Sequence, residues 1–502
     1  MRLPSRLALL LAILAVLITA WIAAVVFEEL PHLEDEYAYV WQAQAIAAGQ
    51  LTVPSPPEPK SFLVPFVVDH EGQRFGKYPL GWPILLAFGE RFNLRMWINP
   101  LLAGLGVWLI YRLGQKIFSD VVGLLAAGLT LSAPFFLMNS GILLSHPWGL
   151  VLSTAFALFW LDMIDESSPI PGWLSTLSAG LTLGVLILSR PLTALGVAIP
   201  FGIHGIILLV RGDNQIRKKL VATGLTVLML GSLHFVWQFV LTGDPLRNPY
   251  TLWWSYDKLG FGPGYGVTEQ GHSLSLAWNH TKFSINAGVS DLFGWGKISW
   301  IFLPFGLWAA RKSKRAWVVS AVFPTLIVIY AAYWVGAWLF GPRYYYEALP
   351  GIVLLTAAGI AYLAGWPLTP GELYQRRWGR ERFRPLAVTG LVTLLIAANM
   401  IFYVPQRLGS MRGLFGINTS QLAPFMTDSA QALTPALVIV HTDHWREYAV
   451  LLDLSDPFLE TPFIFVFSRG AEADANAAGH YPERGVWHYY PDEPNRFYAG
   501  IR

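Results

Sequence analysis

The chain has 502 residues, of which 54% are hydrophobic and only 13% are charged. Ordinary soluble domains carry about 25% charged residues. This balance therefore excludes a typical soluble protein and indicates a chain whose surface faces lipid. The net charge of +3 is too small to suggest a nucleic-acid partner. The absence of cysteine excludes disulfides, thiolate metal ligands and a cysteine nucleophile, although it does not fix the compartment.

About eleven apolar runs fit the roughly 20-residue length that a transmembrane helix needs, so we predict an all-α polytopic membrane protein. The run that begins at residue 7 is too long for a typical signal peptide, and we expect it to remain as an anchor. The predicted spans lie near 7–27, 96–112, 121–138, 147–162, 173–189, 191–210, 220–241, 298–310, 316–340, 348–365 and 386–404.

Lysine and arginine in the short connections predict the orientation of these spans, because such residues gather on the cytoplasmic side. With the N-terminus in the cytoplasm, the basic clusters all fall inside, and an odd number of spans puts the C-terminus outside. The residues of these clusters are Arg2, Arg6, Arg112, Lys116, Arg211, Arg217, Lys218, Lys219, Arg311, Lys312, Lys314, Arg315, Arg376, Arg377, Arg380, Arg382 and Arg384.

Two large loops face the outside in this orientation, at 28–95 and 242–297. The first contains a predicted amphipathic helix at 36–48, which we expect to lie along the membrane surface, and a second short apolar helix after Pro83. The second loop is rich in Gly, Trp, Tyr and Asn and has no clear period, which is typical of an ordered binding loop.

The tail at 405–502 is the third outside segment. Strand-like runs at Ala436–Val440 and Pro462–Phe467, with helix-like stretches around them, predict a small extracytoplasmic α/β domain. We therefore divide the chain into a transmembrane domain at 1–404 and this C-terminal domain.

Three consecutive acids, Glu34, Asp35 and Glu36, follow the first span and provide the strongest chemical signal. Acids at this position also cap a following helix, and that structural reading competes with a functional one. Successive residues of a helix point in different directions, so at most one or two of these carboxylates can face a single pocket.

Two arginines stand at the outer ends of spans, where the positive-inside rule disfavours them. Arg190 directly follows the span at 173–189, and Arg343 lies in the segment Gly341–Glu347. Each either extends toward lipid headgroups or clamps a phosphate with its planar guanidinium. Lys77, beside Tyr78, is a weaker candidate of the same kind.

Histidines supply further candidates, each of which is more often structural than functional. His146 lies in a short outside turn, and His272 lies in the long loop. The segment His441–His444 has metal-like spacing but lacks an obvious third ligand. No Walker loop, nucleophile elbow or zinc-protease motif is present, and an ATP-driven transporter is disfavoured.

Residues 1–400 resemble the GT-C glycosyltransferases, and more narrowly the bacterial protein-mannosyltransferase and aminoarabinose-transferase type. The segments that carry this resemblance are Glu34-Asp35-Glu36-Tyr37 after the first span, Tyr39 to Gly49, Lys77 to Pro83, Arg190-Pro191 and Gly341 to Tyr345. The tail has no counterpart in this resemblance.

The resemblance implies a bacterial plasma-membrane enzyme that takes a sugar from a polyprenyl-phosphate donor. One acid of the pair Asp35-Glu36 would act as general base on an acceptor hydroxyl, with inversion at the sugar. Arg190 and Arg343 would stabilise the departing phosphate. The remaining substrate-binding candidates are Glu34, Tyr37, Lys77, Tyr78, His146, His272, Tyr344 and Tyr345. Some GT-C enzymes use a divalent metal and others do not, and the sequence leaves metal dependence open.

Two other functions compete with this one. A translocase or exporter of lipid-linked glycans accounts for the spans and the outward arginines, but it does not need an acid cluster followed by a long aromatic loop. A glycan polymerase or ligase shares the donor chemistry and differs only in its acceptor. The acceptor itself, whether a protein, a lipid or a glycan, is not readable from the sequence.

Overall fold

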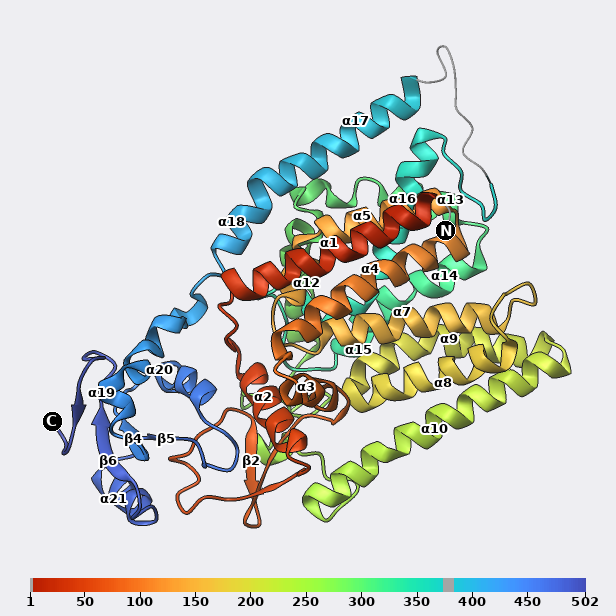
Figure 1. The fold of residues 1–502 in the computed structure, drawn as a ribbon. Helices are drawn as coiled ribbons and strands as arrows, with labels where there is room; N and C mark the ends of the chain where they lie inside the picture. The colour runs from red at the N-terminus through yellow and green to blue at the C-terminus, as the bar shows by residue number, and fades with distance from the viewer. Residues whose placement is uncertain (1–2, 373–382) are drawn as a thin grey trace.

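The computed structural model describes residues 3–372 and 383–502, and it is mostly helical (Figure 1). Seven helices of these residues are long and apolar enough to cross a membrane. An eighth results if α5 (Asp120–Ser132) and α6 (Pro134–Ser140), which meet at a bend of 64°, form one span. The seven are α1 (Leu3–Val25), η1 with α4 (Arg95–Ile117), α8 (Gly172–Ser189), α9 (Pro191–Arg211), α10 (Asn214–Thr242), η3 with α16 (Arg343–Ala364), and the stretch Phe383–Met426 that begins with α17 (Phe383–Ala398).

The chain is thus a multi-pass membrane protein, but three of the about eleven predicted spans have no helix among the described residues that is both long and apolar enough to be a candidate span. Helix α7 (His146–Met163) forms where 147–162 was expected, yet its 18 residues include polar groups at both ends. The run near 298–310 yields only the short helix α13 (Leu303–Ala310). The run at 316–340 divides into α14 (Lys314–Ser320) and α15 (Val322–Tyr330).

Proline accounts for the break between α14 and α15. The ring of Pro324 clashes with the carbonyl of the residue four positions earlier, which is Ser320, and α14 ends at that residue. The chain after Tyr330 leaves the helix altogether, so the linker 331–342 is irregular. Most of the basic cluster Arg376–Arg384 lies outside the described residues, and the orientation of the spans stays a prediction.

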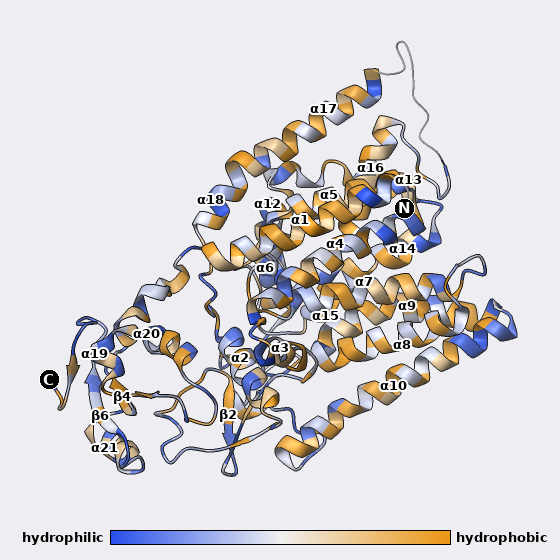
Figure 2. Cartoon of the chain, viewed as in Figure 1, coloured by the Kyte–Doolittle hydropathy of each residue, from blue (hydrophilic) through white to orange (hydrophobic). Residues whose placement is uncertain are grey.

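The helices pack as neighbours in one bundle. Helix α1 packs on α4 and α5, α4 on α7, α7 on α8, and α8 on α10, while α16 packs on α5 and α13. Apolar residues dominate these helices, and polar residues gather at their ends and in the parts outside the bundle (Figure 2). Helices α2 (Glu34–Ala47) and α3 (Gly81–Arg91) lie at the end of the bundle opposite the N-terminus (Figure 1).

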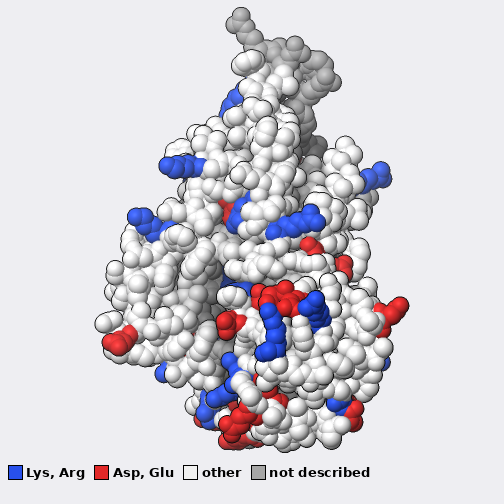
Figure 3. Space-filling view, turned by 90° about the vertical axis from the view of Figure 1, so that its left-hand side faces the viewer, with Lys and Arg blue, Asp and Glu red and all other residues white. Residues whose placement is uncertain are grey.

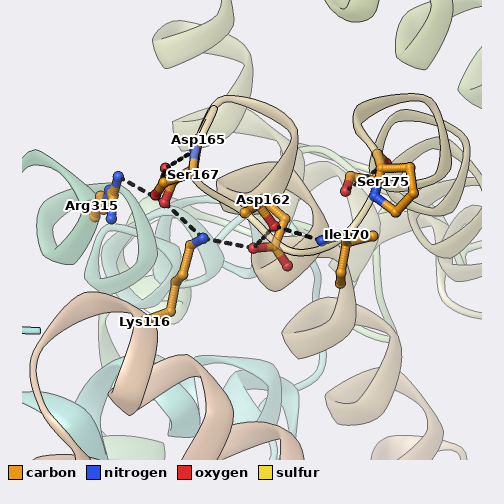
Figure 4. A network of polar contacts seen from close by, with 9 residues as sticks. Lys116, Asp162, Asp165, Ser167, Ile170, Ser175 and Arg315 are labelled. Carbon is orange, nitrogen blue, oxygen red and sulfur yellow. Dashed lines mark hydrogen bonds and ion pairs between the residues drawn. The ribbon is translucent and has the colours of Figure 1, made fainter. Parts of the chain in front are cut away.

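At the N-terminal end of the bundle, a charged network joins three elements (Figure 4). Lys116 of α4 pairs with Asp162 of α7 at 2.7 Å and with Asp165 at 2.8 Å. Arg315 of α14 pairs with Asp165 at 3.3 Å. Hydrogen bonds to Lys116 and to Ser167 hold the pKa of Asp165 below its usual value. The network fixes these helix ends to one another.

The loop at 28–95, which the sequence predicts to lie outside and which keeps the name first outside loop below, has its own helices and sheet. It contains α2, α3 and a three-stranded antiparallel sheet in the order β1-β3-β2, formed by β1 (Val53–Pro54), β2 (Val67–His70) and β3 (Gln73–Gly76). The expected amphipathic helix is present as α2, but residues on all of its faces are buried, including Tyr37, Tyr39 and Trp41. The amphipathic description is therefore wrong, because the helix packs inside the protein on several sides.

The long outside loop also has more order than its sequence suggests. It contains α11 (Tyr250–Trp253) and the 20-residue helix α12 (Leu274–Phe293), which the lack of a clear period concealed. Near the end of α12, Asp291 accepts hydrogen bonds from Arg407 at 2.9 and 3.1 Å and from Tyr403 at 2.7 Å. These contacts attach the loop to α18 (Val404–Gly409).

The tail contains the predicted α/β arrangement. Strands β4 (Ala436–Val440) and β5 (Phe463–Phe467) match the two predicted runs, and with β6 (Gly485–Tyr489) and β7 (Phe497–Tyr498) they form a sheet in the order β5-β4-β6-β7. The first three strands are parallel and β7 is antiparallel. Figure 3 looks onto the face that carries the tail, where charged side chains of both signs gather in the lower half.

One side chain of the first loop completes the core of the tail. Phe62 is 2% exposed and packs with Leu437, Ile439, Ile464 and Val466 of β4 and β5. Next to it, the carbonyl of Ser61 accepts a hydrogen bond of 2.7 Å from the backbone N–H of Phe467. The first loop and the tail therefore share one hydrophobic core.

We expect Phe62→Ala to lower the free energy of opening of the β4–β5 core by about 3 kcal/mol, because it leaves a cavity among apolar side chains. Hydrogen–deuterium exchange of the purified protein measures this at the backbone amides of 436–440 and 463–467. The matched control is Phe92→Ala, since Phe92 lies in the same loop and is 56% exposed. Equal protection of these amides in Phe62→Ala and wild type would contradict the shared core.

Candidate active site

Asp35 lies in the first turn of α2, where its carboxylate meets groups from two other segments. The hydroxyl of Tyr78, which follows β3, donates a hydrogen bond to Oδ1 of Asp35. Nη2 of Arg343, at the start of η3 (Arg343–Ala348), lies 3.7 Å from Oδ2. The side chain of Asp35 is 26% exposed. It is therefore both held in place and accessible to a substrate.

The other two acids of the run point elsewhere, as the 100° step between helical residues requires. Glu34 pairs with Arg446 of the tail at 2.9 Å. Glu36 is fully buried, and its Oε2 accepts a hydrogen bond of 3.3 Å from the backbone N–H of Leu143. Burial raises the pKa of Glu36 to about 8, so this carboxyl is protonated at neutral pH. Of the three acids, Asp35 alone combines an accessible carboxylate with a position beside Arg343.

Arg190 occupies the break between α8 and α9, and protein groups satisfy its guanidinium. Nη1 donates to Ser145 at 2.9 Å, Nε donates to Thr193 at 3.2 Å, and Nη2 donates to Tyr330 at 3.4 Å. Glu347 forms a buried ion pair with Nε at 3.0 Å. Sequence reasoning missed Glu347, although an acid that opens an apolar segment four residues after Arg343 is itself a signal.

Arg343 has spare hydrogen-bonding capacity. Its Nη1 is buried and has no hydrogen-bond partner among the described residues, in contrast to the satisfied guanidinium of Arg190. The guanidinium lies 5.9 Å from the ring of Tyr344, which stacks on Tyr330 at 4.7 Å. Arg343 is thus the cation best placed to receive an anionic group at Asp35.

Tyr39 of α2 connects the surroundings of the two arginines. Its ring lies 4.5 Å from the ring of Tyr78, and its hydroxyl lies 3.4 Å from Oγ of Ser145. His146 follows Ser145, is buried, and lies in the electrostatic field of Arg190 and Arg343. The structure therefore gathers Asp35, Tyr78, Arg190, Arg343, Tyr344 and His146 in one region.

The remaining predicted site residues lie apart from this region or are already paired. Lys77 is buried against Asp257 at 3.1 Å. His272 faces the carbonyl of Ala331 at 2.9 Å, within the long loop. Tyr37 packs edge-on against Trp445 of the tail, and Tyr345 packs edge-on against Phe323 and Tyr330 in the bundle. The structure brings neither Tyr37 nor Tyr345 to Asp35 by any contact.

An apolar groove of about 530 Å³ is lined in part by residues that adjoin the polar region in sequence. Its lining includes Pro79 to Gly81, which directly follow Tyr78, and Leu188, two residues before Arg190. Gly81 is required there, because a Cβ atom would lie 2.1 Å from Oγ of Ser189. The other lining residues are Ile84, Leu85, Phe88, Trp148, Val185, Leu233, His234 and Trp237.

Metal binding finds no support in the described parts of the chain, where no group of three His, Asp or Glu residues could hold an ion. Nε2 of His441 lies 2.8 Å from Nδ1 of His488, so the histidine at the start of the segment His441–His444 pairs across the sheet. Metal dependence of the site stays as open as the sequence left it.

Comparison with known proteins finds similarity in structure only. No family model matches the chain, and no curated protein matches it in sequence. The structure is similar to ArnT from Cupriavidus metallidurans bound to undecaprenyl phosphate, with 13% identity and a TM-score of 0.58 over 96% of this chain and 90% of ArnT. It is also similar to the archaeal oligosaccharyltransferase AglB from Archaeoglobus fulgidus in complex with an inhibitory peptide and a dolichol-phosphate. That match has 13% identity and a TM-score of 0.54 over 96% of this chain and 69% of AglB.

The chain therefore has the fold that these two solved structures share, and this likeness agrees with the expected resemblance to the GT-C glycosyltransferases. At 13% identity the likeness concerns the arrangement of the helices, and the site residues must be argued from their own geometry.

The buried Glu36 predicts a pH dependence of stability. Its pKa rises from an ordinary 4.5 to about 8 in the folded protein, so between these values the folded state holds a proton that the unfolded state has lost. Stability therefore falls as the pH rises from about 4.5 to about 8. Glu36→Gln, which mimics the protonated acid, should remove this pH-dependent contribution to stability.

Thermal unfolding at pH 5 and pH 8 measures the effect, and Glu34→Gln is the control because Glu34 is partly exposed. An unchanged difference between the two pH values in Glu36→Gln would contradict this assignment.

Proposed function

We propose that this protein transfers a sugar from a polyprenyl-phosphate donor to a hydroxyl acceptor on the outer side of the membrane. The observation that carries the proposal is the position of Asp35, which is held between Tyr78 and Arg343, while the residues that directly follow Tyr78 line an apolar groove. A donor of this class has the same layout, with an apolar chain, an anionic phosphate and a sugar in that order.

The chemistry follows from this layout. Asp35 accepts the proton of the acceptor hydroxyl while the hydroxyl oxygen forms a bond to the anomeric carbon. The bond between that carbon and the phosphate oxygen breaks, and its electron pair leaves with the polyprenyl phosphate, so the sugar is inverted. A positioned carboxylate contributes roughly 10²–10⁴-fold to such a step. Arg343 stabilises the charge that develops on the leaving phosphate.

The groove accounts for the lipid part of the donor. Its lining is almost wholly apolar, and it runs between α3, α7, α8 and α10, which belong to or adjoin the membrane-spanning bundle. The structures that share this fold include one with undecaprenyl phosphate and one with dolichol-phosphate, which supports the same class of ligand here. The proposed location is the bacterial plasma membrane, with the N-terminus inside and the tail outside to meet the acceptor.

Asp35→Asn should lower the release of free polyprenyl phosphate by at least about a hundredfold while donor binding is kept, because the amide cannot accept the proton. The assay uses purified protein, a panel of labelled polyprenyl-phosphate sugars and acceptor extracts. Glu34→Gln is the matched control, since it removes a neighbouring carboxylate that faces Arg446. If wild type binds donors but never releases polyprenyl phosphate with any acceptor, translocation becomes the better function.

Narrowing the groove should weaken binding of the lipid chain. We expect Val185→Phe to raise the Kd of a long-chain donor about tenfold, which corresponds to about 1.4 kcal/mol of lost apolar contact. The Kd of a donor with one or two isoprene units should stay unchanged. Val236→Phe is the control, because Val236 lies on α10 outside the groove lining and is 54% exposed. If both variants weakened binding equally, the groove would not be the binding site of the donor's lipid chain.

A further inference from the structure

Lys77, which the sequence marked as a candidate phosphate ligand, lies in an enclosed pocket. Its side chain is 3% exposed, and Nζ lies 3.1 Å from Oδ2 of Asp257. Nζ also lies 3.7 Å from the ring centre of Phe66, 4.7 Å from that of Tyr250 and 5.2 Å from that of Trp254. Aromatic faces attract a cation, so the rings and the carboxylate together occupy the surroundings of the ammonium.

Asp257 joins this pocket to a third segment. Its Oδ1 accepts hydrogen bonds from the hydroxyl of Tyr333 at 2.8 Å and from Nε1 of Trp334 at 3.1 Å. These two residues belong to the irregular linker that follows α15 and leads to Arg343. Asp257 itself belongs to the long outside loop. Its carboxylate thus connects this loop to Lys77 of the first outside loop and to Tyr333 and Trp334 of the linker.

On both sides of the contact between Lys77 and Asp257, the chain carries a residue that contacts Asp35. Tyr78 directly follows Lys77 and donates its hydroxyl to Asp35. On the other side, the ring of Tyr333 lies 6.0 Å from that of Tyr344, the residue after Arg343. The pair therefore connects the segment that carries Tyr78 to the segment that carries Arg343.

We propose that Lys77 and Asp257 are positioning residues, which set Tyr78 and Arg343 on either side of Asp35, and that the donor phosphate is bound by Arg343 and not by Lys77. This inference rests on the proposed function and states which residues position the site and which residue binds the donor phosphate. Burial lowers the pKa of Lys77, and the carboxylate of Asp257 opposes that shift. A phosphate could reach the ammonium only after the pair and its aromatic surroundings had separated.

The test uses Lys77→Met, Asp257→Asn and the double variant in the full-length protein. Each single variant leaves one buried charge without its partner, which is more damaging than removing both. Methionine fills the space of the lysine stem, and in Asp257→Asn the amide oxygen can still accept from Tyr333 and Trp334. We measure kcat per folded molecule and the separate Kd values of polyprenyl phosphate and polyprenol.

We expect both single variants to lose kcat by about tenfold or more, and the double variant to recover to within about threefold of wild type. In all three, the preference for polyprenyl phosphate over polyprenol should persist, since Arg343 is intact. Arg343→Met should abolish that preference. A role in folding alone would change the yield of folded protein without changing kcat per folded molecule.

The inference is overturned if Lys77→Met and the double variant both lose the preference for polyprenyl phosphate, because Lys77 would then bind the phosphate. It is also overturned if the double variant is as inactive as Lys77→Met while binding stays normal. Failure of the proposed function looks different, because wild type itself would then release no polyprenyl phosphate. The two binding constants still test the assignment of the phosphate in that case.

Discussion

The buried ion pair between Arg190 and Glu347 is the contact on which the arrangement of this region depends. It joins the break between α8 and α9 to η3, in an environment where either charge alone would be costly. Glu347 lies four residues after Arg343. The pair therefore fixes the element that presents Arg343 toward Asp35, and Ser145 and Tyr330 complete the same network.

Much of the fold was predictable because hydrophobic runs and strand patterns are local signals. The first anchor, the helices on either side of Arg190 and both strands Ala436–Val440 and Phe463–Phe467 follow from the sequence. The errors have local causes too. Pro324 breaks the predicted run at 316–340 between α14 and α15, the helix ends at Tyr330, and α12 lacks the apolar run that would have marked it.

The candidate site was only partly predictable, because the sequence does not say where side chains point. Glu34, Asp35 and Glu36 are alike as a string, and the structure separates them into an ion pair with the tail, an accessible carboxylate and a buried acid. Similarly, the sequence could not show that Asp257, far along the chain, would form a buried ion pair with Lys77. Such long-range pairings carry no signal at the level of single residues.

The core shared by Phe62 and the tail has a consequence for biosynthesis. Residue 62 leaves the ribosome long before residues 437–466, which supply the side chains that cover it. The side chain of Phe62 therefore stays uncovered until the tail has been synthesised. A chain that stops before residue 437 would leave Phe62 without these apolar neighbours, as well as Tyr37 without Trp445 and Glu34 without Arg446.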